Sequence, residues 1–172
     1  MISFKRIRYK NFLSTGNTPI EVELNKSHTT LIVGNNGSGK STLLDALCYA
    51  LFNKPFRIIK KDQMVNTINQ GDSLVEVEFD VGTNEYMIRR GIKPNIFEIY
   101  QNDKLLNQDA SSIDYQKYLE QNIMKLNYRS FIQVVILGSS AYEPFMKMKP
   151  RYRREVVEEI LDIRVFGLMD LI

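Results

Sequence analysis

Hydrophobic and polar residues alternate along several stretches of the chain, and each stretch predicts a half-buried β-strand. Apolar side chains alternate with glutamates over residues 20–24, and with acidic residues over residues 74–80. Turn residues at 82–84 lead into an expected return strand at residues 86–90, and a further strand is expected at residues 97–100. A period of two places one strand face in the core and the other in water, which is typical of antiparallel sheets. We therefore predict an antiparallel β unit.

The first ten residues predict one more strand, with an irregularity near its middle. Ile2 and Phe4 share one face of an extended chain, whereas Ile7 and Tyr9 share the opposite face. The apolar side of this strand therefore changes between Phe4 and Ile7.

Two short apolar runs predict strands that are buried on both faces. One run is Thr30-Leu31-Ile32-Val33, and the other covers residues 134–137. Continuous apolar runs of this length are typical of strands inside a core.

Apolar residues at helical spacing predict three helices, over residues 40–52, over residues 113–125 and from about Pro150 onwards. The pattern of the last helix continues through a short series spaced by four, three and four residues, namely Leu161, Val165, Leu168 and Ile172. This series is either the beginning of a coiled-coil seam or the apolar face of an ordinary amphipathic helix. Strands and helices together predict an α/β fold, and we expect residues 1–172 to form a single domain.

Residues 34–42, GNNGSGKST, fit the phosphate-loop pattern G-x-x-x-x-G-K-[ST] between a predicted strand and a predicted helix. Such a loop needs backbone N–H groups that converge on phosphates at the N-terminus of a helix. Lys40 can then reach the β- and γ-phosphates, and the Ser41 hydroxyl can bind Mg²⁺. The motif therefore predicts a site for a nucleotide with Mg²⁺.

Composition places few further limits on function. The chain is 44% hydrophobic and 25% charged, which is typical of globular proteins, and its net charge is only +3. The single cysteine, Cys48, excludes an intrachain disulfide and is expected to be a buried core residue. The N-terminus lacks the apolar core of a signal peptide, and no apolar stretch reaches 18 residues. We expect a cytoplasmic protein without a membrane segment.

A nucleotide hydrolase of this class also needs an acidic residue at the end of a second buried strand. Asp80 ends a half-exposed strand, Asp162 belongs to a helix, and the run 134–137 continues into Gly138-Ser139-Ser140. The guanine-reading N-K-x-D motif is missing, which weakens a GTPase interpretation. The sequence thus contains the groups that bind a nucleotide, but we identify no acidic strand end of the kind that hydrolysis requires.

Several stretches, in order, resemble the N-terminal lobe of SMC-like ATPases of double-strand-break repair. This SbcC-type family includes the large subunits of T-even-like phage recombination endonucleases. The matching stretches are KNFLS (10–14), LIVGNNGSGKSTLLDAL (31–47), IKKD (59–62), FIQVVILGSSAYEPFM (131–146) and REVVEEILDI (154–163).

The resemblance implies half of an ABC-type ATPase head, with an antiparallel β subdomain and a C-terminal helix that leads toward a coiled coil. In this family a C-terminal lobe supplies the catalytic acids, and two heads dimerise around ATP and Mg²⁺. The heads bind DNA and work with a metal-dependent SbcD-type nuclease. The resemblance therefore implies an ATPase only as a complete head, with this chain alone inactive or nearly so. For a phage-encoded protein the compartment is the host cytoplasm.

The resemblance also implies roles for particular residues. The phosphates would be surrounded by Asn36, Gly37, Ser38, Gly39, Lys40, Ser41 and Thr42, with Lys40 also catalytic. The segment Val65-Asn66-Thr67 would lie near the base and ribose. The chain departs from the family at Leu13, where an arginine is frequent, and at the strand end, where Ser139 takes the place of a glutamine. Ser41 and Ser139 are accordingly the expected Mg²⁺ ligands.

Two sets of basic residues are candidates for DNA contact. One set consists of Lys54, Arg57, Lys60 and Lys61, and the other lies between residues 147 and 154. Contacts of this kind are made to phosphates and read no bases. The alternative is a solvated face with ion pairs such as Arg154 with Glu158.

Three hypotheses remain open from the sequence. The ordered family stretches favour an ATP-binding half-head of a DNA-repair ATPase. The alternatives are a free-standing P-loop phosphotransferase and a nucleotide-gated scaffold that acts through dimerisation without turnover.

Overall fold

The computed structural model describes residues 2–106, 112–136 and 144–161. Six strands form one sheet in the order β2-β1-β3-β4-β5-β6, and all neighbouring strands are antiparallel. The strands are β1 (Ile2–Lys10), β2 (Ile20–Glu23), β3 (Ser73–Val81), β4 (Asn84–Ile92), β5 (Ile96–Gln101) and β6 (Lys104–Leu105). The helical segments are α1 (Thr42–Phe52), η1 (Lys61–Met64), α2 (Ser112–Tyr118), η2 (Leu119–Met124), α3 (Tyr128–Val135), η3 (Phe145–Lys147) and α4 (Pro150–Ile160).

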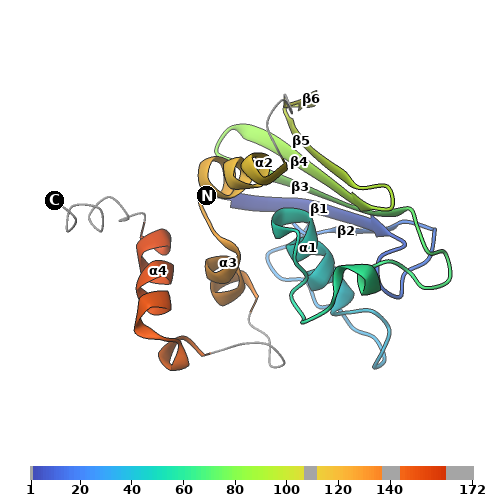
Figure 1. Cartoon of the computed structure of the whole chain (residues 1–172), viewed down its shortest axis with the longest axis horizontal. Helices are drawn as coiled ribbons and strands as arrows, with labels where there is room; N and C mark the ends of the chain where they lie inside the picture. The colour runs from blue at the N-terminus through green and yellow to red at the C-terminus, as the bar shows by residue number, and fades with distance from the viewer. Residues whose placement is uncertain (1, 107–111, 137–143, 162–172) are drawn as a thin grey trace.

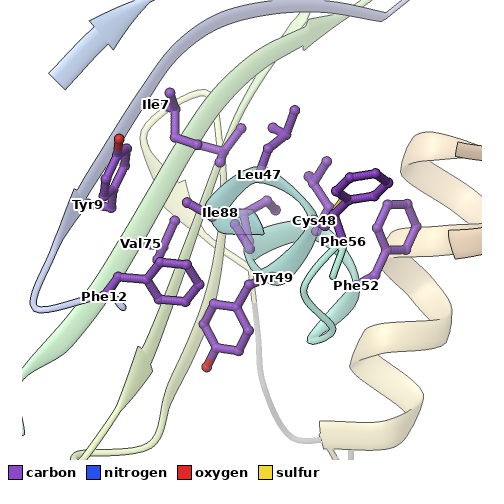
Figure 2. Packing of buried hydrophobic residues seen from close by; sticks show 14 of the residues in the cluster. Ile7, Tyr9, Phe12, Leu47, Cys48, Tyr49, Phe52, Phe56, Val75 and Ile88 are labelled. Atoms are coloured by element: carbon purple, nitrogen blue, oxygen red, sulfur yellow. The ribbon is translucent and has the colours of Figure 1, made fainter. Parts of the chain in front are cut away.

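The helix α1 lies across one face of the sheet, against β1, β3 and β4, and α4 packs on α3 away from the sheet (Figure 1). Nearly every residue of α1 is buried. Its Tyr49 ring stacks on Phe12 with 5.5 Å between ring centroids, and the two rings face each other at the edge of the apolar cluster (Figure 2). The helix that follows the phosphate loop is therefore held against the sheet by buried side chains along its entire length.

The opposite face of the sheet is charged, which explains the alternating glutamates. Arg6 pairs with Glu78 and Glu21 on the two neighbouring strands, at 2.9 and 3.1 Å, and Arg89 pairs with Glu76 at 3.1 Å. The predicted strands and their antiparallel pairing are confirmed. The predicted change of face is also confirmed, because the register of β1 against β3 shifts between Phe4 and Arg6.

The prediction of a buried strand at residues 30–33 is wrong for this structure. These residues form no strand, and Leu31 and Val33 are 84% and 80% exposed. Within the part of the chain that the structure describes, no strand lies beside them to satisfy their backbone groups. A strand cannot form without a neighbour, however apolar its side chains are.

The predicted strand at residues 134–137 is also wrong for its described residues, 134–136. Val134 and Val135 are half exposed and end α3, and Leu137 lies outside the described residues. The N-cap of α3 is Asn127, whose side-chain oxygen accepts a hydrogen bond from Ser130 N at 2.9 Å. This N-cap and the burial of Phe131 on the same helix decide the local structure.

The three predicted helices are confirmed, and α4 begins at Pro150 as expected, since proline is favoured in the first turn. The coiled-coil interpretation stays a prediction. Leu161 is 60% exposed, and Val165, Leu168 and Ile172 lie outside the described residues. No helix among the described residues is long and apolar enough to cross a membrane.

Candidate nucleotide-binding site

The phosphate loop is folded around the side chain of its own lysine. Lys40 Nζ donates hydrogen bonds to the carbonyls of Gly34 and Asn35, at 2.6 and 2.8 Å. Gly37 and Gly39 have φ values of +84° and +90°, where an L-residue is strained. Ser41 is the N-cap of α1, so the loop leads directly into the positive end of the helix dipole.

A pocket of about 420 Å³ opens over this loop. Its lining consists of Leu13, Ser14, Asn36, Gly37, Gly39, Lys40, Ser41, Thr42 and Arg57. A second pocket of about 510 Å³ shares Ser14, Gly37, Gly39 and Lys40 with the first and has Ile20, Val22, Ile32 and Val33 among its apolar lining. Volumes of this size hold small ligands, and backbone N–H groups beside one ammonium suit phosphates.

Six of the seven predicted phosphate-loop residues thus line the first pocket, and Ser38 lines the second. Thr42 N donates to Gly39 O at 2.9 Å, which closes the last turn of the loop. Ser41 stands at the pocket with a hydroxyl of the kind that Mg²⁺ accepts as a ligand. Among the described residues no group of three acidic, histidine or cysteine side chains could hold a metal ion.

Arg57 belongs to the pocket because a buried carboxylate holds it there. Asp45, in the first turn of α1, is fully buried. Its oxygens accept hydrogen bonds from Arg57 N at 3.0 Å and from Arg57 Nε at 2.7 Å, and Nη2 lies 2.5 Å from Oδ2. The guanidinium has further N–H groups beyond these contacts, so it offers hydrogen-bond donors at the pocket, while Asp45 balances its charge. The sequence placed Arg57 with the DNA-contact residues and missed this position.

The other predicted DNA-contact residues are spread over the same region. Lys54 Nζ lies 5.7 Å from the centre of the Tyr128 ring, and Lys60 and Lys61 are exposed at the start of η1. DNA contact by these lysines stays a prediction. Arg154 pairs with Glu158 in α4, as the alternative interpretation of the second basic set expected.

The segment Val65-Asn66-Thr67, unlike the phosphate-loop residues, does not line the two pockets. Val65 and Asn66 are buried and line neither pocket, and Thr67 is exposed. Both side-chain functions of Asn66 are engaged within the protein. The expected contact of this segment with base and ribose stays a prediction. Ser139, the other expected Mg²⁺ ligand, lies outside the described residues.

Cys48 is a core residue, as expected, because it is fully buried in α1. Burial, with a contribution from the charge of Asp45, raises the pKa of its thiol to about 12. The thiol is therefore neutral and takes no part in the site.

Comparison with known proteins identifies the family. A family model described as "AAA domain" matches residues 6–165. Exonuclease subunit 2 of Escherichia phage RB69 is 45% identical over 174 residues, a match that covers 100% of this chain and 31% of that protein. The DNA double-strand break repair Rad50 ATPase of Thermoplasma volcanium is 29% identical, with 92% of this chain and 18% of that protein covered.

Among solved structures, the Smc head domain of Pyrococcus furiosus with an extended coiled coil has a TM-score of 0.70 at 20% identity. That match covers 98% of this chain and 44% of the solved chain, and it shows that the folds are alike. The resemblance to SbcC-type proteins that the motifs indicated is thus confirmed, although this chain spans less than a third of the curated relatives' length. With its family model covering nearly all residues, the chain belongs to the AAA-domain family.

Proposed function

We propose that this chain is the ATP-binding lobe of a DNA recombination and repair ATPase. The observation that carries the proposal is the pocket over the phosphate loop, where Lys40 supplies positive charge, Arg57 N–H donors and Ser41 a hydroxyl. The names of the relatives, an exonuclease subunit and a double-strand break repair ATPase, support the choice of pathway.

In this proposal the pocket over the phosphate loop is one part of a composite active site, and a companion lobe supplies the rest. None of the described residues that line the pocket is acidic, and the nearest carboxylate on α1, Asp45, is buried against Arg57. General-base or metal-binding carboxylates, which such hydrolysis requires, would come from a companion lobe. The apolar segment Leu31–Val33 beside the loop supports this view, since an exposed apolar run next to a site is typical of a surface that is covered by a partner.

In this proposal MgATP binds with its phosphates on the loop. Lys40 neutralises phosphate charge, Arg57 offers N–H donors, and the Ser41 hydroxyl is the group in the pocket that would hold Mg²⁺. Mg²⁺ supplies the Lewis acid chemistry of phosphoryl transfer when it is bound. Two such heads dimerise around ATP, bind DNA and control a metal-dependent nuclease of the SbcD type. Ser139 as a further metal ligand is part of the same proposal.

The decisive experiment compares nucleotide binding with turnover. The chain is titrated with fluorescent N-methylanthraniloyl-ATP and Mg²⁺, and ATP hydrolysis is measured with and without the C-terminal lobe. We expect binding by the chain alone, negligible hydrolysis until the lobe is added, and loss of both on Lys40→Ala. Rapid hydrolysis by the chain alone would contradict the composite site.

DNA contact is tested with the charge-reversal pair Lys60→Glu and Lys61→Glu in the reconstituted head. The expected result is weaker binding of duplex DNA and a shallower dependence of affinity on salt, because two phosphate contacts are lost. The control is the pair Lys104→Glu and Lys117→Glu, which makes the same change of charge at exposed lysines outside both candidate sets. Equal affinity for wild type and the double variant removes these lysines from the DNA surface.

A further inference from the structure

The turn Asn11–Thr15, which follows β1, forms a second wall of the phosphate pocket. Leu13 and Ser14 line the pocket opposite residues of the phosphate loop, and Ser14 also lines the adjoining pocket. This turn is not one that the backbone adopts readily. Asn11 and Leu13 have φ values of +50° and +53°, and the left-handed region is unfavourable for a residue such as Leu13, whereas asparagine tolerates it better. A strained turn of this kind persists only where surrounding contacts enforce it.

The turn closes on itself through hydrogen bonds between Phe12 and Thr15, and Asn66 holds it from outside. Its Nδ2 donates to Thr15 O at 2.9 Å and, less closely, to Leu13 O at 3.4 Å. Its backbone N donates to Asn11 O at 2.9 Å. Three carbonyls of one turn are therefore held by one residue that lies more than 50 positions away in the sequence.

The side-chain oxygen of Asn66 fixes the orientation of the residue. Its Oδ1 accepts hydrogen bonds from Ile68 N at 2.9 Å and Asn69 N at 3.0 Å, so both lone pairs of the oxygen are occupied. The residue is only 6% exposed. A side chain whose donors and acceptor are all engaged in a buried place has one orientation, and it transmits that orientation to the turn.

Neighbouring contacts connect the same two segments. Leu13 N donates a hydrogen bond to Met64 O at 2.6 Å, and Phe12 forms an isolated antiparallel β-bridge with Val65. The Phe12 ring points into the core against Tyr49 of α1 (Figure 2). The turn is thus attached on one side to the helix that follows the phosphate loop and on the other side to Asn66.

From this geometry we infer that Asn66 is a positioning residue for nucleotide binding, and that it acts through the turn Leu13–Ser14 and not by touching the nucleotide. The inference rests on the proposed binding of MgATP at the phosphate loop. It replaces the expected contact of Asn66 with base or ribose by an indirect role, because its polar atoms face the turn and the segment 68–69.

The test uses Asn66→Asp, which keeps the shape and the acceptor oxygen but removes both N–H donors. Affinity for N-methylanthraniloyl-ATP with Mg²⁺ is expected to fall by about fivefold to tenfold, because neither Thr15 O nor Leu13 O then receives a hydrogen bond from residue 66. The matched control is Asn102→Asp, since Asn102 also accepts a backbone hydrogen bond through Oδ1, from Glu85 N, at the far end of the sheet. This control is expected to keep wild-type affinity.

A double-mutant cycle separates positioning from general destabilisation. If Asn66 acts through the turn, Ser14→Ala costs less affinity in the Asn66→Asp background than in the wild type. Additive losses, or wild-type affinity for Asn66→Asp, overturn the inference.

Hydrogen exchange on the wild-type chain keeps the test decisive if the variant does not fold. Amides of residues 12–15 are expected to gain protection when the nucleotide is added, whereas amides of the β5–β6 turn are unchanged. Unchanged exchange at residues 12–15 overturns the inference. If the wild type binds no nucleotide, or Lys40→Ala binds as tightly as wild type, the proposed function itself fails. If both behave as expected and Asn66→Asp keeps wild-type affinity, only the inference about Asn66 fails.

Discussion

The contact between Asp45 and Arg57 makes a sharp prediction for the variant Asp45→Asn. The carboxylate is fully buried in α1, accepts hydrogen bonds from Arg57 N and Nε at 3.0 and 2.7 Å, and forms an ion pair with Nη2 at 2.5 Å. An asparagine has nearly the same shape but no charge, and only one of its two polar atoms accepts hydrogen bonds. The variant therefore removes the charge-assisted contacts without opening a cavity.

The magnitude follows from the exposure of the two partners. Breaking a fully buried ion pair costs about 3–5 kcal/mol, because one charge is left in an apolar place. Here the charge left behind is Arg57, whose side chain is 41% exposed and can be hydrated. We therefore expect a loss of about 2 kcal/mol in the free energy of unfolding, within the range for hydrogen bonds to charged groups. For a chain of this length the loss corresponds to about 4–8 °C in Tm.

The assay is urea unfolding followed by circular dichroism, with nucleotide affinity measured on the same samples. Because Arg57 lines the phosphate pocket, its release should also weaken binding of N-methylanthraniloyl-ATP. The control is Glu158→Gln, which breaks the exposed pair with Arg154 and should cost about 0.3–0.5 kcal/mol.

Two results would refute the reasoning. One is an Asp45→Asn variant whose loss of stability is no larger than that of Glu158→Gln. The other is strict additivity of Asp45→Asn and Arg57→Gln, since residues in direct contact must show a coupling energy.

Three further predictions concern the loop, the core and the apolar edge. Gly39→Ala should lower nucleotide affinity about tenfold, because a residue with a Cβ is strained at φ +90° and the loop will relax; unchanged affinity contradicts this. Burial raises the pKa values of Tyr49 and Tyr128 from 10.0 to about 12, so the unfolded state loses these protons first. Stability, measured as the urea midpoint, should therefore fall as the pH rises from 10 toward 12, and less steeply in Tyr128→Phe; a rising midpoint refutes the assignment. Ile32→Asp should change the unfolding free energy of the isolated chain by less than about 0.5 kcal/mol, yet it should prevent reconstitution of ATPase activity with the C-terminal lobe.

The sequence by itself determined those features that depend on neighbouring residues. The period of two predicted the strands of the sheet, and the position of apolar residues in β1 even located the register shift between Phe4 and Arg6. The phosphate loop could be identified because its function requires glycines, a lysine and a serine at fixed spacing. Such signals are complete within about ten residues, so no knowledge of the rest of the chain is needed.

Only the tertiary structure decided which residues meet across long separations. Arg57 was expected at a DNA surface, but Asp45 holds it at the phosphate pocket. Asn66 was expected near the nucleotide, but its hydrogen bonds go to the turn after β1. The run at residues 30–33 has the composition of a buried strand and is exposed, since burial needs a neighbouring strand as well as apolar side chains. A hydrophobic pattern indicates whether a residue favours burial, whereas the residues it contacts are determined by the tertiary fold of the whole chain.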